Sequence, residues 1–159
     1  MDAAGQYGIA DAIQALKIVR DHSADWDVSP DRVGMLGFSA GAMVASEALL
    51  QRDARLRPSF AALIYGAPFG DMPPTLPKLP PAFMAWTQDD LVALDAVTKF
   101  YGSLKSAGYR PEAHIFNAGD HGFGARAQGT SSDHWIDEFY FRLEAQGLTK
   151  RATASPAQK

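Results

Sequence analysis

Cysteine is absent from the 159-residue chain, and this absence excludes disulfide bonds, thiolate metal ligands and a cysteine nucleophile. An excess of positive charge is also absent, since the formal net charge is −3, and nucleic acid or an anionic membrane is therefore not an expected partner. No apolar run approaches the roughly 18 residues of a membrane span. The first residues have neither the basic start nor the apolar core of a signal peptide. These absences predict a cytoplasmic protein.

The chain alternates short apolar runs with helix-like segments. Strands are expected over 33–38, 60–66, 82–88 and 112–118, and helices over 9–22, 40–52, 92–108 and 131–147. This alternation predicts an α/β domain over 1–148, with a parallel sheet of about four strands flanked by helices, followed by a flexible tail over 149–159. The proline-rich segment 71–81 is expected to be irregular, as a surface linker or as a flap beside a site. Ser131 or Ser132 is expected to cap the last helix.

A serine between two glycines stands where the first expected strand meets a helix. The residues there are Gly37-Phe38-Ser39-Ala40-Gly41. A serine hydroxyl is a weak nucleophile until a base takes its proton. The Gly-x-Ser-x-Gly turn pushes such a hydroxyl outward, and its glycines let strand and helix pack closely. The pattern predicts that Ser39 is a nucleophile. The alternative is a glycine-rich turn with a capping serine.

Acids and a histidine follow two later strands at the same edge of the expected sheet. Asp89 and Asp90 follow the third strand, and His121 lies in a glycine-rich loop after the fourth. Sites in parallel sheets gather at the carboxyl ends of the strands. A carboxylate there would orient an imidazole that acts as base, although aspartate also caps helices well. The chain order Ser39, Asp90, His121 is that of α/β-hydrolases.

The remaining histidines have ordinary structural explanations from their places near a helix end, inside a strand and in a first helical turn. They are His22, His114 and His134. A metal site is not expected, because no two histidines share ligand spacing and no cluster of acids with histidine recurs. The sequence implies no cofactor.

Three motifs together resemble the α/β-hydrolase superfamily. They read GFSAG, TQDDLV and HIFNAGDHGFG. The chain is most similar to the acetyl-esterase/lipase and dienelactone-hydrolase-like carboxylesterases, acetylxylan-esterase-like members included. The resemblance implies that Ser39 is the nucleophile, His121 the general base and Asp90 the triad acid, with Asp89 as the runner-up. It also implies that the N–H of Ala40 forms half of an oxyanion hole.

The chain resembles only the C-terminal half of that fold. Family members carry further strands before the helix at 9–22, together with a glycine-rich loop that supplies the other oxyanion donors. The resemblance therefore implies a bare, apolar edge on the strand 33–38, and such an edge invites pairing with another chain. We expect a homo-oligomer in which a second copy covers this edge. The loss of one oxyanion donor would lower the rate about 10²- to 10³-fold.

The leading functional prediction is a serine esterase that cleaves short-chain acyl esters through an acyl-enzyme, with a small-molecule ester as its partner. Apolar residues near the strand ends are candidates for a small acyl pocket, although ordinary packing explains them equally well. They are Phe38, Pro68, Phe69 and Phe123. The alternatives are a non-catalytic or weakly active hydrolase-like half-domain that serves assembly or binding, and peptide or thioester cleavage by the same triad.

Overall fold

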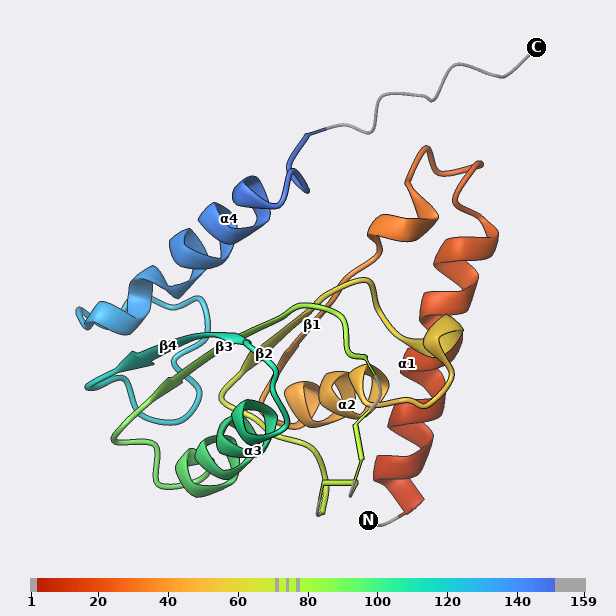
Figure 1. The fold of residues 1–159 in the computed structure, drawn as a ribbon. Helices are drawn as coiled ribbons and strands as arrows, with labels where there is room; N and C mark the ends of the chain where they lie inside the picture. The colour runs from red at the N-terminus through yellow and green to blue at the C-terminus, as the bar shows by residue number, and fades with distance from the viewer. Residues whose placement is uncertain (1–2, 71, 74, 77, 151–159) are drawn as a thin grey trace.

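The computed structural model describes residues 3–150 except 71, 74 and 77. Four strands and four α-helices alternate along this part of the chain, in the order expected from the sequence (Figure 1). The strands are β1 (Met35–Phe38), β2 (Ala61–Ile64), β3 (Ala82–Thr87) and β4 (Glu112–Phe116). The helices are α1 (Ala3–Asp21), α2 (Ala40–Leu49), α3 (Leu94–Ser106) and α4 (Trp135–Ala145). No helix in these described residues is long and apolar enough to cross a membrane.

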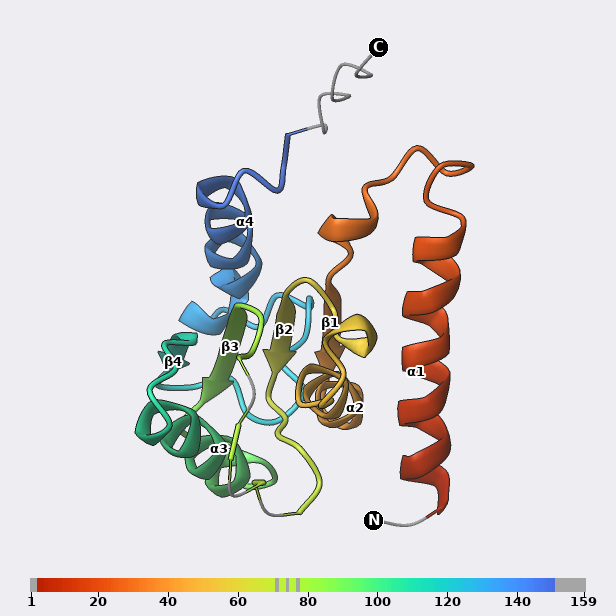
Figure 2. The same ribbon diagram turned by 45° about the vertical axis from the view of Figure 1, so that its right-hand side comes forward.

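All strand pairs are parallel, and the order across the sheet is β1-β2-β3-β4. The arrows of β1, β2 and β3 point the same way in Figure 2. Phe38 at the end of β1 is in register with Ile64 at the end of β2, and Thr87 at the end of β3 is in register with Phe116 of β4. The residues that follow the strands therefore meet at one edge of the sheet.

Alternate strand residues point to opposite faces of the sheet, and a cluster of buried residues lies on each face. Leu63 and Met84 belong to the core cluster that includes residues of α2 and α3. Ile64 and Phe83 belong to the other cluster, where Trp135 of α4 is buried. Helix α1 packs on α2, and in Figure 2 α1 and α4 lie on opposite sides of the sheet. The prediction of a parallel sheet flanked by helices is confirmed.

Strand β1 has a hydrogen-bonded neighbour on one side only among the described residues. Two of its apolar side chains are exposed, Leu36 by 42% and Phe38 by 37%. An open edge of this kind is a template for pairing with another strand. The expected bare edge is therefore present, and the homo-oligomer that would cover it stays a prediction.

The expected serine cap of the last helix is wrong. Residues Ser131–His134 form a 3-10 turn before α4, and neither this turn nor α4 receives a side-chain cap hydrogen bond. The Ser132 hydroxyl is instead bonded to the Thr130 hydroxyl at 2.7 Å. The Asp133 carboxylate accepts the N–H of Gln128 at 2.9 Å, so the polar groups at this turn serve the preceding loop.

The proline-rich segment 71–81 has neither helix nor strand among its described residues, as expected. Its position depends on the buried guanidinium of Arg57, which donates to the carbonyl oxygen of Lys78 at 2.8 Å and to that of Gln51 at 2.5 Å. Three residues of the segment, and residues 151–159 of the expected tail, lie outside the described part of the chain.

Candidate active site

Ser39 occupies a strained turn between β1 and α2. Its φ of +49° lies in a region that non-glycine residues seldom adopt. The turn is tight because a Cβ at Gly37 would overlap the carbonyl oxygen of Gly41, and one at Gly66 would overlap that of Ser39. Glycine at these positions therefore lets α2 lie directly against β1 and β2. The strain is typical of a nucleophile held at the top of a strand.

The side chains of Ser39, His121 and Asp90 form a continuous hydrogen-bonded row. The Ser39 Oγ atom lies 2.8 Å from His121 Nε2. His121 Nδ1 lies 2.9 Å from Asp90 Oδ2 and 3.1 Å from Oδ1. A carboxylate only accepts hydrogen bonds, so Nδ1 carries the proton and Nε2 is left free to accept the proton of the Ser39 hydroxyl. The structure thus brings the three residues proposed from the sequence within hydrogen-bond distance of one another.

Asp90 is fully buried, and the protein supplies it with donors on two sides. Its Oδ1 accepts the backbone N–H groups of Val92 at 2.9 Å and Ala93 at 2.8 Å, just before α3. These two bonds form a turn before α3, whose N-cap residue is Ala93 and which receives no side-chain cap hydrogen bond. They hold the carboxylate against the residues that lead into α3.

Asp89, the runner-up for the acid, faces the backbone of the histidine loop. Its Oδ1 accepts the N–H of Asp120 at 2.9 Å, and its Oδ2 accepts the N–H of Gly119 at 3.1 Å. The Asp120 N–H and then the Thr87 hydroxyl lower the pKa of Asp89 below its ordinary value; desolvation opposes them, and the Gly119 N–H adds to the lowering. Asp90 therefore contacts the ring of His121, whereas Asp89 contacts the backbone of the two residues before it.

Tyr65 is a site residue that the sequence reasoning missed. It directly follows β2, has a φ of +40°, and packs its ring edge-on against His121 with centroids 5.1 Å apart. Burial raises the pKa of its hydroxyl above the ordinary value, the Gly124 backbone opposes this, and the charge of Asp90 adds to it. No signal in the sequence marks it, because Tyr65 falls inside the strand expected over 60–66, whereas β2 ends at Ile64 and leaves Tyr65 directly after the strand.

Positive φ marks the whole site. Ser39, Tyr65 and Asp120 all have φ between +40° and +59°, and among the described non-glycine residues only Asp27 shares this feature. Such backbone strain persists where the surrounding structure enforces it. Ser39 directly follows β1, Tyr65 directly follows β2, and Asp120 directly precedes His121. The strained residues therefore lie at the same edge of the sheet.

The four candidate pocket residues have different surroundings. Phe38 is partly exposed beside Ser39, with its ring 5.6 Å from Trp135 in an edge-on contact. Pro68 and Phe69 are half-buried in the segment after β2. Phe123 is 1% exposed and packs 4.7 Å from the Tyr65 ring. In this structure Phe123 is therefore a support for Tyr65 and is covered from solvent.

The α2 N-terminus lies beside Ser39. Helix α2 begins at Ala40, so the N–H groups of its first turn have no partner within the helix. The helix dipole adds positive potential at the same point. The Ala40 N–H therefore lies at the positive end of α2, directly after Ser39.

The other histidines are engaged elsewhere. His22 contacts Asp25 in the turn after α1, and His134 contacts Asp137 at the start of α4, each at 3.1 Å and exposed. His114 lies 3.1 Å from Glu112 in β4. No cluster of three or more potential metal ligands occurs among the residues that the structure describes.

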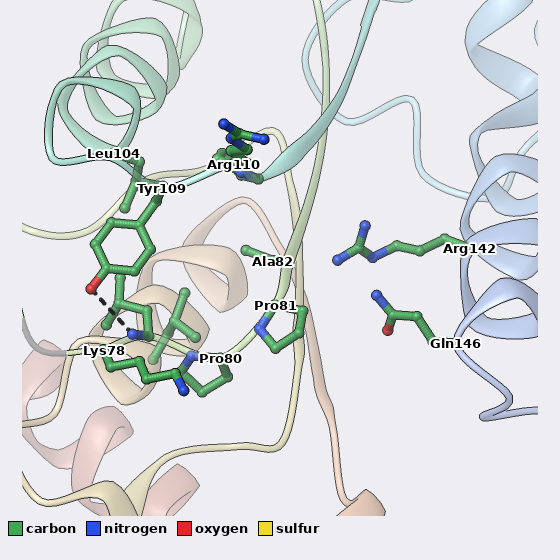
Figure 3. A pocket seen from close by; sticks show the side chains of 12 residues that line it. Lys78, Pro80, Pro81, Ala82, Leu104, Tyr109, Arg110, Arg142 and Gln146 are labelled. Carbon is green, nitrogen blue, oxygen red and sulfur yellow. Dashed lines mark hydrogen bonds between the residues drawn. The ribbon is translucent and has the colours of Figure 1, made fainter.

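A cavity of about 510 Å³ lies away from Ser39, around the start of β3 (Figure 3). In Figure 3, Arg142 and Gln146 reach from α4 toward Pro81 and Ala82. Lys78 and Arg110 also line it. Its lining holds cations, apolar groups and the polar side chains of Tyr109 and Gln146, but no serine, histidine or acid.

The parallel sheet flanked by helices is part of an α/β-hydrolase fold. No family model matches the chain. A curated relative, an acetylxylan esterase from Xylanibacter ruminicola, is 28% identical over an alignment of 151 residues, which covers 73% of this chain. The chain spans about a third of that relative, since the alignment covers 31% of its length.

Solved structures agree with this class. An α/β-hydrolase enzyme from a Medee basin deep-sea metagenome library has a TM-score of 0.71 at 26% identity, and the match covers 86% of this chain and 63% of the other. An acetyl ester-xyloside bifunctional hydrolase from Caldicellulosiruptor lactoaceticus has a TM-score of 0.76 at 25% identity, with 89% and 66% covered. Thermogutta terrifontis esterase 2 phosphoramylated by tabun, at 22% identity and a TM-score of 0.69, shares the fold, with 88% and 64% covered. The resemblance to α/β-hydrolase esterases is confirmed.

Proposed function

We propose that this chain carries the nucleophile, base and acid of a serine carboxylic-ester hydrolase. The observation that supports the proposal best is the unbroken row from Ser39 Oγ through both ring nitrogens of His121 to Asp90. Each neighbouring pair in it is within hydrogen-bond distance, as a nucleophile and its base require. The strained turn at Ser39 gives further support, because it presents the hydroxyl outward.

In the first half of the reaction, Ser39 Oγ attacks the ester carbonyl while His121 Nε2 takes the hydroxyl proton. The carbonyl oxygen becomes negative and is stabilised by the Ala40 N–H at the start of α2. Asp90 stabilises the imidazolium through Nδ1–H. His121 then gives the proton to the leaving alkoxide, the bond between the carbonyl carbon and that oxygen breaks, and an acyl-Ser39 ester remains.

In the second half, water attacks the acyl-Ser39 carbonyl and gives a proton to His121. The tetrahedral intermediate collapses as His121 returns that proton to Ser39 Oγ, and the free acid leaves. The sum of the two halves is one ester and one water converted to an alcohol and an acid. His121 and Ser39 end in their starting protonation states.

Short acyl groups, acetyl above all, are the proposed acyl class, and the alcohol is proposed to be a sugar. The names of two relatives support this, an acetylxylan esterase and an acetyl ester-xyloside hydrolase. The aromatic rings of Phe38 and Tyr65 near Ser39 and His121 also favour a small apolar acyl group over a long chain. Their ring centroids lie 5.9 Å apart.

Turnover of a matched series of nitrophenyl esters, from acetyl to decanoyl, tests the proposal. We expect the highest kcat/KM for acetyl or propionyl, with turnover abolished in Ser39→Ala. Equal rates for the native protein and Ser39→Ala would contradict it and would favour a binding or assembly role. Acetylated xylo-oligosaccharide and a thioester are assayed in parallel. Faster turnover of the first indicates a sugar alcohol as the leaving group, and faster turnover of the second indicates a thiol.

A further inference from the structure

We infer that Asp89 is a positioning residue that fixes the loop carrying His121, so that the imidazole reaches Ser39 and Asp90 together. This inference rests on the proposed function of His121 as the base. Asp89 itself touches no reacting atom. It acts on the backbone just before His121.

The Asp89 carboxylate is bound at both oxygens by the loop. Oδ1 accepts from Asp120 N at 2.9 Å and Oδ2 from Gly119 N at 3.1 Å. These bonds join the end of β3 to a loop some thirty residues later in the chain. Because the two N–H groups use different oxygens, one accepting atom cannot replace the pair.

The loop needs such a hold because Asp120 has a φ of +59°, which non-glycine residues seldom adopt. The preceding residue is glycine and takes a φ of +152° without strain. The Asp120 side chain turns back to accept the N–H of His121 at 2.7 Å. A strained segment persists only when its surroundings fix it, and Asp89 supplies the contact on the β3 side.

Other contacts hold the carbonyl groups of the same two residues. The Thr87 hydroxyl donates to the Asp120 carbonyl at 3.4 Å, and the Gln128 side chain donates to the Gly119 carbonyl at 3.2 Å. Thr87 is the last residue of β3 and is fully buried. The sheet therefore fixes the chain just before Asp89, and the Asp89 carboxylate in turn fixes the loop. Asp89 remains charged at neutral pH, since its pKa is lowered by the N–H groups that it accepts.

The adjacent aspartates thus divide two tasks. Asp90 holds the ring of His121 through Nδ1, and Asp89 holds the backbone that leads into it. Loss of the first should stop the chemistry, while loss of the second should move the base by a fraction of an ångström to about an ångström. A misplacement of about 1 Å costs roughly 10²-fold in rate.

The test is Asp89→Asn, with Asp53→Asn as the matched control. An asparagine offers one accepting oxygen, and its NH₂ group would face the second N–H donor. Asp53 also accepts a backbone N–H, that of Arg55 at 2.9 Å, but it lies in the 3-10 turn before β2 and contacts no site residue. Both variants remove one negative charge. Only the first touches the histidine loop.

For Asp89→Asn we expect fluorophosphonate labelling of Ser39 to slow about 10- to 100-fold, and kcat for acetyl esters to fall with KM unchanged. Amide hydrogen exchange at Asp120 and His121 should accelerate. The low-field proton signal of the His121–Asp90 bond should weaken. Asp53→Asn should match the native protein in every readout, and Asp89→Glu, which keeps charge and both oxygens, should recover part of the loss.

Native rates of labelling and exchange in Asp89→Asn would overturn the inference. If Asp89→Asn does not fold, Asp89→Glu carries the test, because its displaced carboxylate should still slow labelling and speed exchange. If the native protein itself is not labelled, the proposed function fails. Amide hydrogen exchange at Asp120 and His121 still tests whether Asp89 fixes the loop. Faster exchange then supports the loop contact, and unchanged exchange refutes it.

Discussion

Asp90→Asn is the substitution whose effect the geometry determines most sharply. Asp90 Oδ1 accepts from Val92 N, Ala93 N and His121 Nδ1, while Oδ2 accepts from Nδ1. An asparagine whose oxygen stays on the Val92 and Ala93 N–H groups places its NH₂ group against Nδ1. Since NH₂ only donates, Nδ1 must give up its hydrogen and Nε2 must carry it. His121 can then no longer accept the proton of Ser39.

The expected magnitudes follow from this switch of tautomer. The same change in a serine protease triad lowers kcat about 10⁴-fold, which corresponds to about 5.5 kcal/mol of transition-state stabilisation. The fold should lose much less, because the bonds from the Val92 and Ala93 N–H groups remain and a neutral hydrogen bond to Nδ1 replaces the charged one. We expect the unfolding free energy to fall by less than about 2 kcal/mol.

The assay is the rate of fluorophosphonate labelling at neutral pH, together with urea unfolding of the same samples. Asp90→Asn should be labelled about 10⁴-fold more slowly while it remains folded, and far more slowly than Asp89→Asn. Labelling of folded Asp90→Asn at the native rate would refute the assigned tautomer and the role of Asp90.

Three further predictions concern packing, pH and assembly. In urea unfolding, Gly66→Ala should destabilise the fold by about 1–3 kcal/mol, because its Cβ would overlap the Ser39 carbonyl, and it should also slow labelling. Gly102→Ala in α3 has open space around it and should instead stabilise the fold by about 0.5–1 kcal/mol. Burial raises the pKa of Glu47 above 4.5, against the Phe69 N–H bond, so its ionisation disfavours the folded state as pH rises through and above that range. Glu47→Gln should therefore melt at a higher temperature than the native protein at about pH 7 and at nearly the same temperature at about pH 4; an equal difference at both values would contradict this. The exposed β1 edge predicts association that grows with concentration in sedimentation and weakens in Leu36→Lys, and a strictly monomeric native protein would disprove it.

The order and type of the main elements were predictable from periodicity, because apolar runs and amphipathic helices carry strong signals. Their ends were less predictable. The last helix begins at Trp135 and not at the expected Ser131, since the Ser132 hydroxyl is bonded to Thr130 and no side chain caps the turn. Local capping rules fail where a nearby loop competes for the same polar groups.

The sequence also placed the members of the candidate site at one edge of a parallel sheet. It left Asp89 and Asp90 as alternatives, because adjacent residues point different ways only once the chain leaving β3 is fixed in space. Tyr65 was missed because its role depends on a ring contact with His121 across the sheet edge. Phe123 was offered as a pocket residue, but burial depends on the whole tertiary packing, which covers it.

We expect His121 to activate Ser39 in this chain. Intact-mass analysis after fluorophosphonate treatment of the native protein and of Ser39→Ala is the measurement to make first. Activation should give one adduct on the native protein and none on Ser39→Ala. A folded native protein that gains no adduct, or a Ser39→Ala variant labelled equally fast, would contradict it.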